Sequence, residues 1–344
     1  MTNVLNTLYV STPKAYVALE SESLKVRVER ETRLQIPIHH LMSVVCIGPV
    51  TMSPEAMGAC AKRGVSIVFL AWNGRFLARV EGPLAATATL RRAQHCACEA
   101  SPRGLELARA FVAGKIANCR QVLLRAARTR EASDRISRAA ARLATLARRS
   151  TSIGDLAVLR GAEGEAAARY FEVFDDMLAV DVANDEPVFR FEKRSRRPPR
   201  NEVNALLSFG YALLHSDTLA AVQAAGLDPG MGFLHEERPG RPALALDLME
   251  ELRALWVDRR VMAMIRRRQI ELKGFERLPT GEVRMSDSSR KTFLQVYQEA
   301  KRVEITHPLT GQRIPWGLVP LVQARLLARA IRNEGEYVPF LLEK

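Results

Sequence analysis

The spacing of apolar residues changes its period once along the chain, near residue 85. Before this point, apolar and polar residues alternate in short stretches such as Leu24-Lys25-Val26-Arg27-Val28, which is the repeat of a half-buried strand. From Leu84 to Ile153 the chain is nearly free of proline and glycine and rich in alanine, leucine and arginine, which favours long helices. The two repeats require different backbones, so the sequence predicts two regions of different architecture.

Several local signals support strands and turns in the first region. Leu34 to Ile38 alternates again, and Pro37 within it indicates an edge strand. Ser53-Pro54-Glu55 has the N-cap, first-turn proline and first-turn acid of a short helix. Asn73-Gly74 joins two apolar stretches and predicts a hairpin.

Helical patterns continue to residue 334 and are interrupted at residues 196–201, 227–232, 237–242 and 279–287. The 344 residues are more than one small core needs. We therefore predict an α+β protein, with a β-rich, β-sandwich-like domain at residues 1–85 and a larger all-α helical domain at residues 86–344.

The charge balance points to a partner. The formal net charge is +13, and arginines cluster at residues 125–149, 190–200 and 259–268. Arginine binds phosphate through paired hydrogen bonds, so nucleic acid held by its backbone is one interpretation. The alternative is a solvated arginine-rich face that reflects a GC-rich genome. The N-terminus lacks a secretion signal and the apolar runs are shorter than a membrane span, so we expect a cytoplasmic protein without a membrane partner.

Five cysteines without paired spacing indicate reduced thiols rather than a disulfide framework. His95-Cys96-Ala97-Cys98 resembles half of a metal clip, but no second ligand pair follows at a fixed spacing. A helix that carries small buried thiols is the simpler interpretation.

The segment GRPALALDLMEELR, residues 240–253, combines an apolar helix pattern with three acids, Asp247, Glu250 and Glu251. Carboxylates this close repel each other unless cations or protons separate them. A surface helix would tolerate the repulsion, but the leucines of this segment favour burial. A divalent metal would resolve the conflict, and one histidine with two carboxylates suits Mn²⁺ or Mg²⁺. His235, at the end of the preceding loop, is a candidate ligand, although a lone histidine in an apolar stretch is more often a core residue.

Two earlier segments are ambiguous by spacing alone. Glu163 lies between Gly161 and Gly164, where a ligand could approach, or it is a first-turn acid favoured by the helix dipole. Asn204, Ser208 and Tyr211 form a polar stripe on an apolar helix, and such a stripe either satisfies itself or faces a site.

Four of these motifs together carry a resemblance. GAEGEAAARYF, NALLSFGYALL, GLDPGMGFLH and RPALALDLMEELR resemble, in this order, CRISPR-associated protein one, the nuclease and integrase that inserts spacers into a CRISPR array. The resemblance covers essentially the whole chain, and the wording of the motifs is most similar to the type I-C branch.

The resemblance implies a metal site and a reaction. Glu163, His235 and Glu250 match the family's metal ligands, and the third is Glu here where the family often has Asp. Asp247 matches a supporting acid, Asn204, Ser208 and Tyr211 match a polar face near the metal, and Arg253 matches a base that contacts phosphate. The activity implied is DNA cleavage and transesterification with Mn²⁺ or Mg²⁺.

The resemblance also implies partners: double-stranded DNA, the small CRISPR-associated protein two, and a second copy of the chain, with the β-rich domain as the dimer contact. Arg194, Arg196 and Arg197 are the candidates for further DNA contacts. Two alternatives keep the fold but change the role: a non-catalytic DNA-binding scaffold, and a nuclease for branched DNA in repair.

Overall fold

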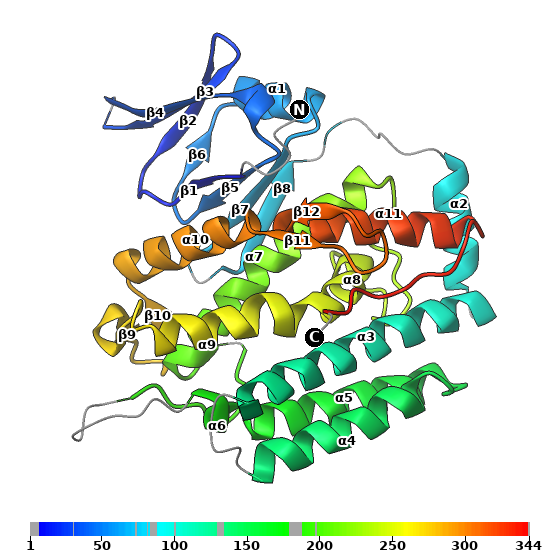
Figure 1. Cartoon of the computed structure of the whole chain (residues 1–344). Coiled ribbons are helices and arrows are strands. Elements are labelled where there is room, and N and C mark those ends of the chain that lie inside the picture. Colours follow the sequence, from blue (N-terminus) through cyan, green and yellow to red (C-terminus); the bar gives the residue numbers. More distant parts are fainter. Residues whose placement is uncertain are drawn as a thin grey trace.

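The computed structural model describes residues 7–29, 31–72, 74–80, 82, 88–99, 101–128, 134–178, 188–196 and 198–342. A β-rich region precedes a larger helical region, as predicted (Figure 1). The β-rich region contains β1 (Thr7–Val10), β2 (Tyr16–Glu20), β3 (Ser23–Val28), β4 (Glu31–Pro37), η1 (Ile38–His40), β5 (Ser43–Ile47), β6 (Thr51–Met52), α1 (Pro54–Lys62), β7 (Ser66–Leu70) and β8 (Phe76–Val80).

Two four-stranded sheets build this region. One has the order β1-β5-β7-β8, in which β1, β5 and β7 are parallel, and the other has the order β4-β3-β2-β6. β5 is buried along its whole length because both faces of the first sheet are covered. Val44 and Cys46 pack with residues of the other sheet and α1, whereas Val45 and Ile47 join the core of the helical region. The alternation of a strand therefore lets one sheet serve two cores.

The structure confirms the edge strand, the helix cap and the turn that were predicted in this region. β4, which ends at Pro37, pairs only with β3 among the described strands and is a sheet edge. The Ser53 hydroxyl accepts a hydrogen bond from the Ala56 amide and caps α1. The turn between β7 and β8 includes Gly74, at φ +80°, whereas Asn73 lies outside the described residues, as does the predicted domain boundary at residue 85.

The helical region is built mainly from long helices: α2 (Ala88–Cys98), α3 (Pro102–Arg128), α4 (Asp134–Ser150), α5 (Leu156–Glu172), α6 (Phe174–Leu178), α7 (Glu202–Ala224), α8 (Ala243–Arg253), the π-helical turn η2 (Ala254–Asp258), α9 (Arg259–Arg266), η3 (Leu272–Gly274), α10 (Asp287–Lys301), η4 (Trp316–Leu318) and α11 (Val319–Ile331). It also contains two short antiparallel hairpins, β9 (Phe275–Arg277) with β10 (Val283–Met285) and β11 (Glu304–Thr306) with β12 (Arg313–Pro315). The region is therefore mainly helical rather than free of strands.

α7 is the one helix of the described residues that is both long and markedly apolar. By length and composition it could cross a membrane, but 67% of its most apolar window is buried inside the structure. Helices α8 and α11 pack against it in the centre of the molecule (Figure 1). Its hydrophobicity is that of a core helix.

A buried polar cluster joins the two regions. The Lys301 ammonium lies 2.7 Å from an Asp217 carboxylate oxygen and donates to the Thr7 hydroxyl at 3.2 Å. Asp217 also accepts a hydrogen bond from the Tyr297 hydroxyl. The first strand is thereby tied to α7 and α10, which orients the β-rich region against the helices.

Candidate active site

The acidic helix α8 lies in the interior, as its leucines predicted. Asp247, Glu250 and Glu251 are 0%, 3% and 0% exposed. α8 packs against α3 and α7, so each carboxylate must find its partners within the protein.

Asp247 organises the loop that precedes α8. Its carboxylate accepts hydrogen bonds from the backbone amides of Phe233, Leu234 and His235 at 2.6, 3.0 and 2.9 Å. The same carboxylate lies 2.6 Å from His235 Nδ1. An Nδ1–H that donates to Asp247 leaves the Nε2 lone pair of His235 free to bind a cation.

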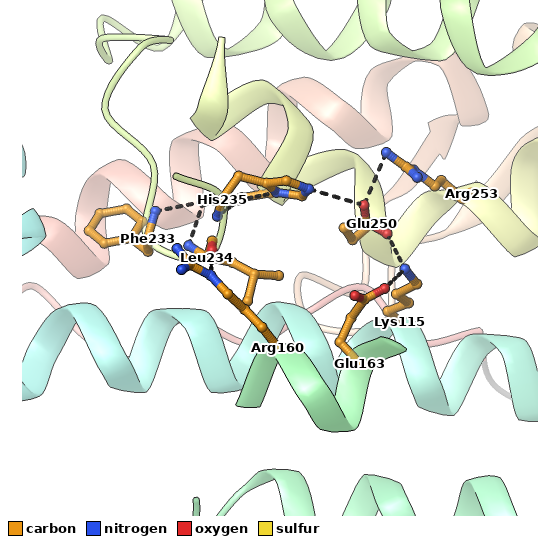
Figure 2. Close-up of polar contacts among 9 residues, drawn as sticks. Lys115, Arg160, Glu163, Phe233, Leu234, His235, Glu250 and Arg253 are labelled. Carbon is orange, nitrogen blue, oxygen red and sulfur yellow. Dashed lines mark hydrogen bonds and ion pairs between the residues drawn. The ribbon is translucent and has the colours of Figure 1, made fainter. Parts of the chain in front are cut away.

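Three segments far apart in sequence meet at this point (Figure 2). His235 Nε2 lies 3.8 Å from Glu250 Oε1, and the other oxygen, Oε2, lies 2.6 Å from the Lys115 ammonium. Lys115, on α3, also pairs with Glu163 Oε1 from α5. Glu163 is in the middle of α5, so the interpretation of it as a first-turn acid is wrong.

Lys115 is the residue of this cluster that the sequence analysis missed. A signal was present, because Lys115 follows Phe111 by four residues and precedes Cys119 by four, which places a cation on the buried face of α3. A charge on a core face needs an opposite charge nearby, and here two carboxylates supply it.

The opposite charges of the cluster stabilise one another's ionised forms. Burial alone would raise the pKa of Glu250, but Arg253, Lys115 and His235 outweigh it and lower that pKa to about 2. Burial opposes protonation of Lys115, yet Glu250 and Glu163 raise its pKa. The structure therefore holds an ionised acid and an ionised amine side by side.

Arginines flank the cluster on one side. A guanidinium nitrogen of Arg253 lies 3.0 Å from Glu250 Oε1, and its guanidinium carbon is 5.3 Å from the centre of the Tyr211 ring. The guanidinium carbon of Arg194 lies 5.4 Å from the same ring centre. Tyr211 is thus in cation–π distance of two arginines.

The polar stripe of α7, which consists of Asn204, Ser208 and Tyr211, contacts these arginines. Arg194 donates to Asn204 Oδ1 at 2.6 Å and to the Ser208 hydroxyl at 3.1 Å. The Tyr211 hydroxyl donates to Asp258 Oδ1 at 2.6 Å, and burial raises the pKa of Asp258 to about 6. Asp258, in the π-helical turn η2, was not singled out from the sequence.

Glu251 was grouped with the other two acids and belongs to a different site. Its carboxylate accepts from Gln323 and Tyr337 at 2.9 Å and from the Phe340 amide at 3.0 Å. Burial raises its pKa to about 8, although these donors oppose the rise. Glu251 therefore holds the C-terminal segment against α8 rather than facing Glu163 and His235.

A cleft of about 2130 Å³ opens at the site, which is larger than the space that a small ligand needs. Its walls come from the first sheet, α7, α8 and the loop before α8. Among the lining residues are the four clustered groups and several bases: Lys115, Glu163, His235, Glu250, Arg75, Arg79, Arg194, Arg196, Arg238, Arg241 and Arg253. Arg197 lies outside the described residues.

Within the described part of the chain, no three His, Cys, Asp or Glu side chains are arranged closely enough to hold a metal ion. At Glu163 and Glu250 the reason is visible, because the Lys115 ammonium lies between the two carboxylates (Figure 2). His95, Cys96 and Cys98 lie in α2, as predicted, and all five cysteines are free thiols, but Cys96 is exposed and Cys98 is half-buried, so the prediction of buried thiols is wrong for Cys96. The donors of the first cluster, two carboxylates that already bind a cation and an imidazole nitrogen beside them, fit a divalent metal.

His215, which also lines the cleft, gives a pH-dependent prediction. Burial, with Arg253 and Arg79 nearby, lowers its pKa to about 4 from an ordinary value near 6.5. Between these values the unfolded chain binds a proton that the folded chain does not, so stability falls as pH falls from 6.5 to 4, by at most about 3 kcal/mol. Urea unfolding of His215→Gln across this range is expected to show a shallower pH slope than wild type. The exposed His39→Gln is the control, and an unchanged slope in both variants would contradict the prediction.

The family model "CRISPR associated protein Cas1" matches residues 8–299 of the chain. The chain belongs to the Cas1 family. It is 45% identical to the CRISPR-associated endonuclease Cas1 1 of Moorella thermoacetica and 44% identical to that of Chlorobaculum tepidum, with 98% of each chain covered. These names do not specify a subtype, so type I-C remains a prediction.

Solved structures agree in fold over the whole length. A Cas1 protein from Thermotoga maritima aligns with a TM-score of 0.81 at 23% identity, covering 98% of this chain and 100% of that one. A casposase bound to an integration product aligns with a TM-score of 0.80 at 23% identity, covering 98% and 95%. A Cas6-RT-Cas1–Cas2 complex aligns with a TM-score of 0.83 at 24% identity, covering 99% of this chain and 36% of that chain. The β-rich region followed by a helical region is thus the Cas1 fold.

Proposed function

We propose that this Cas1 protein is a metal-dependent DNA endonuclease and integrase that joins captured DNA to a CRISPR repeat. The observation that carries the proposal is the convergence of Glu163, His235 and Glu250 from three separate segments at a basic cleft. The names of the relatives, CRISPR-associated endonuclease Cas1, support nuclease chemistry. The likeness to a casposase in complex with an integration product agrees with it in fold.

Glu163, His235 and Glu250 would hold the metal, which we propose to be Mn²⁺ or Mg²⁺. Carboxylate oxygens suit both ions, and one imidazole is compatible with Mn²⁺. A bound divalent ion would polarise a phosphate oxygen and lower the pKa of a nucleophile. Asp247 keeps the His235 ring in the orientation and tautomer that a ligand needs, so His235 is a ligand rather than a general base.

The reaction that fits the site exchanges one phosphodiester for another. The 3′-hydroxyl oxygen of a captured fragment forms a bond to a phosphorus atom of the repeat, and the existing bond from that phosphorus to a 3′ oxygen breaks. The number of phosphodiester bonds is unchanged, so no nucleotide hydrolysis is required. Arg253, which pairs with Glu250, and Arg194, which lies against the same Tyr211 ring as Arg253, would bind the negatively charged phosphates. Water in place of the hydroxyl makes the same site a nuclease.

The basic cleft is proposed to bind double-stranded DNA through its backbone. Arg194, Arg196 and Arg253 line it, and Arg197 is a further candidate. With about four or more phosphate contacts, the dissociation constant is expected to rise about a hundredfold or more between 50 and 200 mM salt. Fluorescence anisotropy with a labelled duplex measures this. Arg196→Ala should reduce the slope of log K against log salt by about one, whereas a salt-independent affinity would contradict backbone binding.

We propose two protein partners. One is CRISPR-associated protein two, since solved neighbours of this fold are Cas1–Cas2 complexes. The other is a second copy of the chain, through the β-rich region. β4 and β8 are edge strands, and Leu34, Phe76 and Leu77 on them are 43%, 41% and 48% exposed, as expected of edges that a partner covers. All of these activities would take place in the cytoplasm of a prokaryote.

An integration assay tests the proposal directly. Purified protein, its small partner, a short duplex with 3′-hydroxyl ends and a supercoiled array plasmid are combined with Mn²⁺ or Mg²⁺. Joining of the duplex to the repeat, abolished by a chelator, is the expected result. DNA binding without any metal-dependent cleavage or joining would favour a non-catalytic scaffold, and cleavage of branched DNA alone would favour a repair nuclease.

A further inference from the structure

Lys115 lies between the two carboxylates proposed as metal ligands. Its ammonium contacts Glu163 from α5 and, at 2.6 Å, Glu250 from α8, while its own backbone belongs to α3. The side chain is 11% exposed, so water does little to screen these contacts. One amine thus connects the three helices that form the site (Figure 2).

The position is specific to Lys115 within the described residues. Arg253 also pairs with Glu250, at 3.0 Å, but it approaches Oε1, whereas Lys115 approaches Oε2. Glu163 forms an ion pair with Lys115. The lysine is therefore the cation that bridges the two acids, the same role that a divalent ion would have.

We propose that Lys115 is a built-in competitor of the metal, which occupies the divalent-cation site in the metal-free protein and leaves it when the metal binds. The inference rests on the proposed function, because it takes Glu163 and Glu250 as ligands. A divalent ion held by the same two carboxylates would repel the ammonium that lies between them, so the ammonium would have to leave that position. Lys115 lines the cleft, and its flexible four-carbon stem can move the ammonium into that space.

Two consequences follow from this competition. The metal-free protein keeps its acids neutralised, so α3, α5 and α8 stay packed without a metal. The protein also binds the metal more weakly than it would without Lys115, since each metal ion must displace the ammonium.

Mn²⁺ binding to the full chain tests the inference by titration calorimetry. Lys115→Met keeps the length of the side chain and removes its charge, and it is expected to bind Mn²⁺ about tenfold more tightly than wild type. Lys115→Gln, which can still hydrogen-bond a carboxylate, is a second neutral variant with the same expectation. Lys115→Arg keeps the charge and should bind Mn²⁺ no more tightly than wild type.

Thermal unfolding gives a readout independent of activity. Neutral Lys115 variants should melt at a lower temperature than wild type without metal and close to wild type when saturated with Mn²⁺. Lys301→Met is the matched control, because Lys301 is also buried and lines the same cleft but pairs with Asp217, which is not a proposed metal ligand. It should lower both melting temperatures alike and leave Mn²⁺ affinity unchanged.

The outcomes separate this inference from the proposed function. Mn²⁺ affinity that is unchanged or weaker in Lys115→Met, with wild-type binding that depends on His235, overturns the role of Lys115 alone. An equal gain of affinity in Lys301→Met also overturns it, since the effect would then be one of net charge. If wild type does not bind Mn²⁺, or His235→Ala binds it equally well, both proposals fail.

Discussion

Replacing Glu163 or His235 with alanine is expected to lower metal-dependent cleavage and integration by about a thousandfold or more, with the fold retained. Each side chain brings a donor atom to the cluster, and under the proposed assignment a site that lost one of its three protein ligands would hold the metal weakly. For Glu250 the better substitution is glutamine, because alanine would leave Lys115 and Arg253 without a shared buried partner. Rates are measured by single-turnover joining of a labelled duplex.

Glu165→Ala is the matched control for Glu163→Ala. Both acids are on α5, but Glu165 pairs with Arg142 near the surface instead of facing the cleft. The control should retain activity within about twofold, as expected for a weak surface ion pair. Full activity in either Glu163→Ala or His235→Ala would refute the ligand assignment.

Asp247→Ala is expected to have the largest effect on stability, a loss of about 3–5 kcal/mol in the free energy of unfolding. The carboxylate is fully buried and accepts three backbone hydrogen bonds as well as facing the His235 ring. Alanine would leave those donors without an acceptor and release the loop that carries His235. Denaturant unfolding measures the loss, and weaker Mn²⁺ binding should accompany it.

Two further variants, Asp247→Asn and Asp155→Ala, provide comparisons for this loss of stability. Asparagine retains one carbonyl acceptor, so an intermediate loss is expected. Asp155 is an exposed N-cap whose carboxylate accepts one amide hydrogen bond, and its removal should cost about 1 kcal/mol. A loss in Asp247→Ala no larger than that of Asp155→Ala would show that the buried hydrogen bonds contribute little.

The site itself was only partly predictable. The motifs identified Glu163, His235, Asp247 and Glu250, and the structure brings these four residues to one place. Glu251 was predicted beside them because it is adjacent in sequence, yet successive residues of a helix point in different directions, and it faces the C-terminal segment instead. Asp258 was missed because its partner, Tyr211, lies on another helix far away in sequence.

The sequence by itself determined the succession of a β-rich and a helical region, the family, and the residue types of the site. These follow from local repeats and short motifs, which depend on neighbours along the chain. Only the tertiary structure decided that Lys115 lies between Glu163 and Glu250, and that the stripe of α7 holds Arg194. Contacts between helices depend on how the side chains of distant segments pack together. The spacing of residues within one segment does not specify which other segment will pack against it.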